Sequence, residues 1–142
     1  MRKFILKTEE KLRLSLLLLR LGVFVVMFMW ALDKFINPEH AIGIFRQFYF
    51  LNGMSTGIMY ALGAVEVVIV LGFVAGFKKR WTYGIVLALH AVSTFSSFGR
   101  YLDPWKNLLF FAAWPMLAAC ITLYLLRDDD TLCAVDTKRL AA

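Results

Sequence analysis

The sequence predicts an all-α fold, a bundle of four antiparallel transmembrane helices with both termini in the cytoplasm. Two observations predict it. The apolar fraction of 61% and the mean hydropathy of +0.69 are high for a chain of 142 residues, since ordinary soluble domains are about 45–50% apolar. The charged residues also gather at the chain ends and between apolar runs, as a membrane requires, because each charge in the hydrocarbon costs roughly 2.5–3.5 kcal/mol.

Four apolar runs are long enough to cross a hydrocarbon layer of about 30 Å. They cover residues 12–36, 54–77, 81–98 and 105–126, and a short cytoplasmic tail, 127–142, completes a single membrane domain. A cleaved signal peptide is the alternative for the first run. That run is too long for a signal peptide, and no small-residue cleavage site follows it, so we expect a retained helix.

Proline, glycine and the basic turn residues give further detail within these runs. Pro115 lies in the middle of the fourth run, where a membrane helix tolerates proline with a kink. Gly72 and Gly76 form a GxxxG pattern that permits close helix packing. The break at Lys78–Arg80 is short, so the second and third helices are expected to be antiparallel neighbours.

The segment between the first two runs has a different character. Pro38 ends the first helix, and the following residues up to Gly53 mix aromatic and aliphatic side chains with Arg46 and Gln47. The segment is too short and too mixed to cross a membrane. We expect it to lie in the membrane interface as an amphipathic turn or short helix.

The orientation follows from the distribution of basic residues. Eleven Lys and Arg residues lie before the first run, in the turn after the second and in the tail, whereas only four lie on the opposite side. This bias places both termini in the cytoplasm. The net charge of +6 is explained by topology and by contact with anionic lipid, and no separate basic patch indicates nucleic-acid binding.

The spacing of the cysteines and the absence of cofactor-binding motifs argue against several kinds of site. Cys120 and Cys133 have neither disulfide-framework nor zinc-site spacing, so we expect a buried Cys120 and a free Cys133 thiol. His40 is predicted outside and His90 inside the membrane, which argues against a bis-His haem. GxGxxG, P-loop, HExxH and CxxC motifs are absent. We therefore expect no intrinsic cofactor and no metal, and no nucleic acid among the partners.

Three titratable residues lie at similar depth inside the predicted spans. Arg20, Glu66 and His90 come from three different helices, at depths of roughly 12, 16 and 14 Å at about 1.5 Å per residue. Charged groups avoid lipid, so we expect all three to point inward, with Arg20 paired to Glu66 and His90 close by.

Other polar residues extend this predicted polar seam. Lys34 follows Arg20 by close to four helical turns and so shares its face. The candidates for ligand binding or proton exchange are Arg20, Lys34, Glu66, His90, Ser93, Thr94, Ser97 and Asn107. A structural interpretation remains open, in which the ion pair only holds two helices together and the hydroxyls bond to carbonyls one turn back.

The segments LSLLLLRLGVFVVMFMWALDKFINP and ALGAVEVVIVLGFVAGFKKRWTYGIVLALHAV resemble the DoxX/DoxD-like family of small four-helix membrane proteins. The matching features are Arg20 in the first run, Lys34 and Pro38 at its exit, and Glu66 before the turn that begins at Gly76. The resemblance covers most of the chain. It implies a bacterial or archaeal cytoplasmic membrane, and it carries over only Arg20, Lys34 and Glu66.

The resemblance also implies a redox setting, because one lineage is associated with thiosulfate:quinone oxidoreductase and others with redox or sulfur metabolism. The first hypothesis is therefore a membrane subunit of a quinone-linked or sulfur-metabolism complex, whose polar seam binds a quinone or another small polar ligand. The second is a non-catalytic anchor that binds membrane or peripheral proteins. The third is a small-solute or proton conduit formed by a homo-oligomer. Whether the chain is an enzyme stays open.

Overall fold

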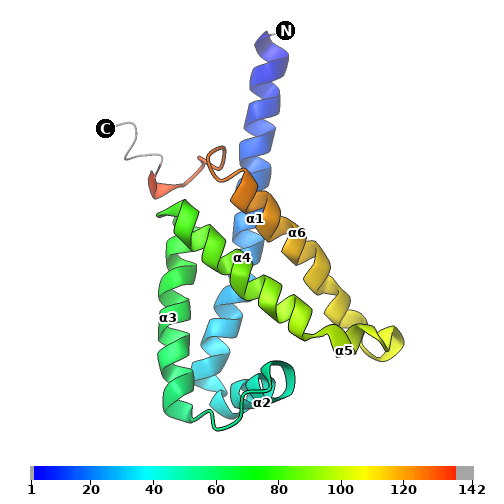
Figure 1. The fold of residues 1–142 in the computed structure, drawn as a ribbon. Coiled ribbons are helices and arrows are strands. Elements are labelled where there is room, and N and C mark those ends of the chain that lie inside the picture. Colours follow the sequence, from blue (N-terminus) through cyan, green and yellow to red (C-terminus); the bar gives the residue numbers. More distant parts are fainter. Residues whose placement is uncertain (1, 137–142) are drawn as a thin grey trace.

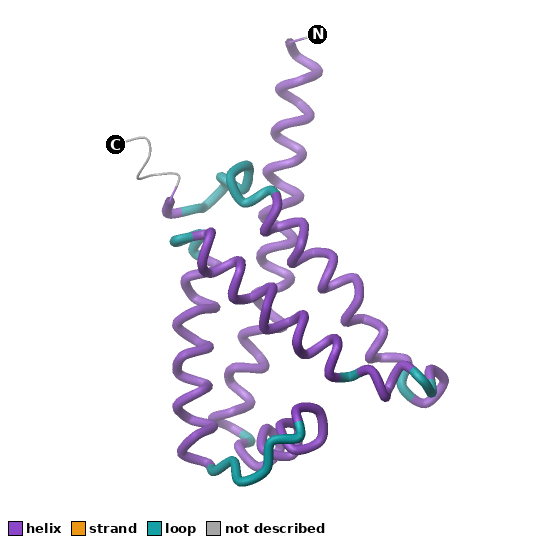
Figure 2. Tube along the Cα trace, in the orientation of Figure 1, coloured by secondary structure: helices purple, strands orange, loops and turns teal. Residues whose placement is uncertain are grey.

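The computed structural model describes residues 2–136, with side chains from Lys7 onward. This part of the chain is helical and contains no strand (Figures 1 and 2). The all-α prediction is therefore confirmed. The basic residues Lys138 and Arg139, which entered the prediction of orientation, lie outside the described residues, as do the side chains of Arg2 and Lys3.

The first helix, α1, covers Arg2–Ile36 and is longer than expected. It begins ahead of the predicted start at Leu12, so its first turns extend beyond the rest of the bundle (Figure 1). Its end agrees with the prediction. Pro38 is the first residue of the next helix, α2 (Pro38–Tyr49), where its missing N–H costs no helical hydrogen bond. The segment after α1 is therefore a short helix.

The next two helices are joined by a short turn and run in opposite directions from it, diverging away from the turn (Figure 1). Helix α3 covers Thr56–Val74, and the Ser55 side chain caps it by accepting a hydrogen bond from the Ile58 N–H. Helix α4 covers Lys79–Ser96. The turn between them includes Gly76, whose φ of +62° lies in the left-handed region that favours glycine.

The fourth predicted span, 105–126, is not one continuous helix. A short helix α5 (Phe98–Tyr101) and two 3₁₀ turns, η1 (Pro104–Lys106) and η2 (Leu108–Ala112), precede helix α6 (Ala113–Leu125). Pro115 lies near the middle of the apolar helical segment Leu108–Leu125, just after the change from 3₁₀ to α-helix, and the kink there stays a prediction. Pro115 is the third residue of α6, and η2 continues directly into this helix, since the Ala113 N–H donates to the Phe110 carbonyl.

The helices form two arms that diverge from a shared core. Helix α1 packs along α3, and α4 packs along α6. The arms meet near the turn between α3 and α4, hereafter the turn end, and separate toward the opposite α2 end (Figure 1). The buried core is made of Leu16, Val23, Met27, Val70, Phe73, Tyr83, Val86, Cys120 and Leu123.

Aromatic side chains connect the arms at the α2 end. Arg100 lies over the rings of Phe48 on α2 and Phe110 on η2, at 5.5 and 5.8 Å from their centroids. The two rings are themselves 5.8 Å apart. Cation–π and ring contacts of this kind hold α2 against the segment that leads into α6.

Three helical segments of the described chain are long and apolar enough to cross a membrane, namely Lys7–Ile36, Thr56–Val74 and Leu108–Leu125. They indicate a membrane protein. Helix α4 is of similar length, but it carries Lys79, Arg80 and His90 along with several hydroxyl groups, and it is less apolar than the other three.

Candidate functional site

A buried ion pair lies at the turn end, and it is not the pair that the sequence predicts. Arg20 on α1 is fully buried, and its Nη1 is 3.2 Å from Oδ2 of Asp130, which is also fully buried. Nη1 donates to the Tyr83 hydroxyl at 3.1 Å, and this hydroxyl donates to Asp130 Oδ2 at 2.7 Å. The three side chains close a triangle between α1, α4 and the segment after α6.

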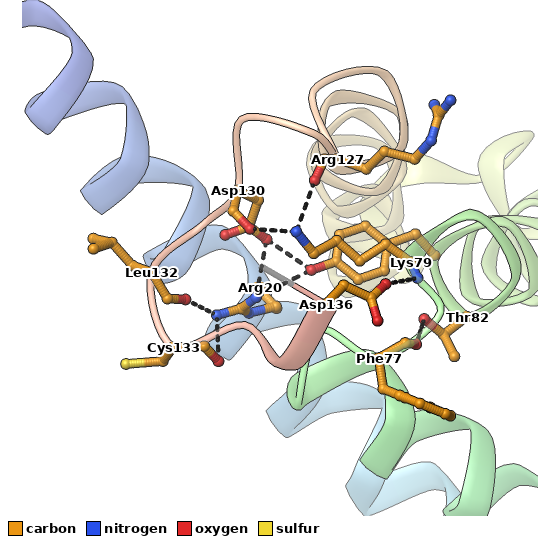
Figure 3. Close-up of polar contacts among 10 residues, drawn as sticks. Arg20, Phe77, Lys79, Thr82, Arg127, Asp130, Leu132, Cys133 and Asp136 are labelled. Carbon is orange, nitrogen blue, oxygen red and sulfur yellow. Dashed lines mark hydrogen bonds and ion pairs between the residues drawn. The ribbon is translucent and has the colours of Figure 1, made fainter. Parts of the chain in front are cut away.

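The segment that follows α6, residues 127–136, is called the tail here. Its backbone is bound to α1 by Arg20, whose Nη2 donates to the carbonyls of Leu132 and Cys133 (Figure 3). The Cys133 thiol is free and exposed, as predicted, whereas Cys120 is a buried free thiol. The two Nη groups of Arg20 therefore bind the tail and Tyr83.

The first residue of α4, Lys79, also binds the tail. The Lys79 ammonium donates to the carbonyls of Arg127 and Asp130 at 3.2 and 2.8 Å (Figure 3). The Asp136 carboxylate accepts the backbone N–H groups of Lys78 and Lys79 at 3.0 and 3.1 Å. Lys79 precedes the predicted span 81–98. Burial lowers its pKa, and the negative charges of Asp130 and Asp136 oppose that shift.

The predicted pairing of Arg20 with Glu66 is wrong. Glu66 on α3 binds Lys34 on α1, with 2.6 Å between Nζ and Oε2 and only 12% and 13% of the two side chains exposed. The Lys34 ammonium also donates to the Trp30 carbonyl at 3.1 Å. The charges of α1 are thus neutralised separately, Arg20 by the tail and Lys34 by α3.

The polar stripe predicted on the third span lies on α4. The Thr94 hydroxyl donates to the His90 carbonyl at 2.8 Å, and the Ser97 hydroxyl donates to the Ser93 carbonyl at 3.0 Å. These are the bonds to the preceding turn that the structural interpretation predicted for hydroxyls in a helix. Asn107 makes a local bond as well, since its amide donates to the Asp103 carbonyl at 2.9 Å.

His90 differs from these hydroxyl residues, because one of its two ring nitrogens has no hydrogen-bond partner in the described chain. It is 1% exposed, and its Nε2 lies 3.0 Å from the Ala113 carbonyl of α6. A carbonyl only accepts, so Nε2 carries the hydrogen. Nδ1 is then an acceptor in the neutral ring, and among the described residues it has no hydrogen-bond partner. Such buried unpaired atoms call for an explanation.

His90 also lines a groove of about 900 Å³ between α1, α4 and the segment that leads into α6. One wall is α1, which contributes the small residue Gly22. The opposite wall belongs to η2 and α6 and includes Pro115. The remaining lining side chains are mostly apolar, and the polar ones are His90, Ser93, Ser97, Ser15 and the indole of Trp30. This composition suits a ligand with a long apolar part and a small polar head.

Only some of the predicted site residues therefore lie together. The structure brings His90, Ser93 and Ser97 to the groove, whereas Arg20, Lys34, Glu66 and Asn107 do not line it. Thr94 does not line it either, and its hydroxyl donates to the His90 carbonyl. Sequence reasoning missed Asp130 and Lys79, which hold the tail, and it placed Tyr83 in the polar stripe of the third span without predicting its bonds to Arg20 and Asp130. Within the described part of the chain, no group of three or more His, Cys, Asp or Glu residues could hold a metal ion.

Comparisons of the chain with protein-family models, with curated proteins and with solved structures give no match. The assignment of a function therefore depends on the groove and on the buried charges themselves.

Proposed function

We propose that the chain crosses the membrane four times, with both termini in the cytoplasm of a bacterial or archaeal cell. Three apolar helical segments support this topology, and α4, antiparallel to α3 and 18 residues long, would be the fourth span. The start of α1, the α3–α4 turn and the tail lie at one end of the bundle (Figure 1). That end has most of the basic residues, which the positive-inside rule places in the cytoplasm.

We propose further that the chain is the membrane subunit of a quinone-linked redox complex and binds a quinone head group in the groove. The observation that carries this proposal is His90, a buried imidazole with an unpaired Nδ1 among the residues that line a mostly apolar groove. The resemblance to DoxX/DoxD-like proteins agrees with a redox role. An electron-transfer partner would supply the redox centre.

The chemistry of the ring specifies how the head group would bind. Nε2 donates to the Ala113 carbonyl, so the neutral ring offers an acceptor at Nδ1. The hydroxyl of a reduced quinol can donate to such an acceptor. The hydroxyls of Ser93 and Ser97 lie on the same groove wall, and the isoprenoid chain would occupy the apolar walls.

A quinone measurement on two histidine variants tests this proposal. Full-length protein is purified in mild detergent from its native host, and bound quinone is measured by mass spectrometry. His90→Gln places an amide near the Nε2 position and keeps the bond to Ala113, whereas His90→Asn places one near Nδ1. We expect stoichiometric quinone in the wild-type protein, a loss in His90→Gln and partial retention in His90→Asn. Quinone that is absent from wild type, or unchanged in His90→Gln, would contradict the proposal.

A second candidate is a non-catalytic anchor for membrane or peripheral proteins. It is favoured by the closed ion pairs, because Arg20 and Glu66 are neutralised within the chain and neither reaches the groove. The same purification distinguishes the two functions. An anchor would co-purify with a partner protein and no quinone, and its His90→Gln variant would assemble with that partner normally.

A further inference from the structure

We propose that the turn end binds the head-group phosphate of an anionic phospholipid. The site is a cleft of about 680 Å³ between the α3–α4 turn and the tail, lined by Lys78, Arg80 and Arg127 among others. It shares no lining residue with the groove. The inference rests on the proposed membrane placement and does not depend on quinone binding.

The charges in this cleft favour an anion. The lining carboxylate of Asp136 is already bound by two backbone N–H groups, and Lys79 is bound by two tail carbonyls. Within residues 7–136, the side chains of Lys78, Arg80 and Arg127 form no ion pair. Lys78 and Arg80 are therefore the cationic side chains left for an anion, because the Arg127 guanidinium donates to the Tyr124 carbonyl at 2.7 Å and lies over the Tyr124 ring. One other lining carboxylate, Asp128, opposes them.

A buried hydroxyl provides an independent indication of a ligand. Thr131 lines the cleft, and its Oγ1 is buried with no hydrogen-bond partner in the described chain. Buried hydroxyls are normally paired, so an unpaired one at a cationic cleft calls for an acceptor. A phosphate oxygen would accept from Thr131 and from the guanidinium group of Arg80.

The surface beside the cleft favours a lipid over a soluble phosphate. Trp81 lines the cleft and is 68% exposed, and tryptophan is enriched at membrane interfaces. From Trp81 an exposed apolar stripe continues along one face of α4, through Ile85, Leu89 and Val92. An acyl chain can follow this stripe while the phosphate stays among the cations.

Native mass spectrometry of the full-length protein in neutral detergent tests the proposal, with phosphatidylglycerol and phosphatidylcholine as the two probes. We expect tighter binding of phosphatidylglycerol. Arg80→Gln should weaken that binding about five-fold, the effect of one cation at a membrane surface. Thr131→Val should weaken it as well, without lowering the thermal stability of the lipid-free protein. Arg46→Gln removes an exposed charge on α2 and should leave the affinity unchanged.

Three results would overturn the inference. Equal binding of the two lipids would show that the anionic head group is not recognised. Unchanged phosphatidylglycerol binding in both Arg80→Gln and Thr131→Val would place the lipid elsewhere. Displacement of phosphatidylglycerol by an equal concentration of inorganic phosphate would identify a soluble anion as the ligand. The quinone content of the same preparations is measured in parallel, so failure of this inference is distinguishable from failure of the proposed function.

Discussion

Arg20 and Asp130 form a fully buried ion pair, with 3.2 Å between Nη1 and Oδ2, that joins the first helix to the tail after the last one. Tyr83 bonds to both side chains from α4. The tail is consequently part of the folded structure. Its backbone is also anchored to the α3–α4 turn, where the Val135 N–H donates to the Ala75 carbonyl at 2.9 Å.

Loss of the Asp130 carboxylate should destabilise the protein strongly. Asp130→Ala leaves the Arg20 guanidinium buried without a counter-charge, which lowers the free energy of unfolding by about 3–5 kcal/mol. Chemical denaturation in detergent measures this loss. Asp129→Ala removes a neighbouring exposed carboxylate and should change stability by less than about 0.5 kcal/mol. Similar losses in the two variants would contradict the buried pair.

Gly76 should not tolerate a side chain. A Cβ there would lie 2.7 Å from the Ala134 Cβ and 2.9 Å from Arg20 Nη1, and the φ of +62° is unfavourable for alanine. We expect Gly76→Ala to lower the free energy of unfolding by about 1–3 kcal/mol, the usual effect of overpacking. Gly99→Ala has open space around the new Cβ and serves as the control in the same thermal unfolding measurement.

The Lys34–Glu66 pair should respond to a charge exchange. Lys34→Glu places two carboxylates at this contact, and Glu66→Lys places two ammonium groups there. Each variant should therefore lower the free energy of unfolding by about 1.5–3 kcal/mol. The double variant restores opposite charges and should recover most of the loss. Thermal unfolding of all four proteins gives the coupling energy. A double variant that shows only the sum of the two losses would contradict a direct pair.

Gly22 offers a way to fill the groove without disturbing the fold. It lines the groove, and a Cβ at this position meets no atom within 4 Å. Gly22→Phe should therefore keep the thermal stability of the protein while it lowers the amount of quinone that co-purifies. The matched control is Gly43→Phe on α2, which also has open space around the new side chain but lies outside the groove.

The helical fold was predictable because its signals are local. Apolar runs, Pro38 and the basic turn before α4 indicate where helices start and stop, and most of these boundaries agree with the structure. The prediction of the last span was less accurate. Hydrophobicity does not distinguish 3₁₀ turns from α-helix, so one continuous helix was predicted over 105–126, where the α-helix begins only at Ala113.

The partners of the buried charges could not be predicted in the same way. Depth along the helices predicts that Arg20 lies near Glu66, because these are opposite charges at similar depth within the spans. The tail returns to the bundle through contacts between residues far apart in sequence, and nothing local distinguishes Asp130 from the two aspartates before it. The groove position of His90 depends on how far α6 separates from α1, which is again a tertiary property.

Photolabelling tests the central claim, quinone binding in the groove, most directly. Full-length protein in lipid nanodiscs is irradiated with a photoreactive quinone analogue, and labelled peptides are identified by mass spectrometry. We predict labels on α1 at residues 18–26 and on the segment 109–119, reduced by excess natural quinone and by Gly22→Phe. Labels spread over the lipid-facing surface of α3, insensitive to both, would show that the groove does not bind quinone.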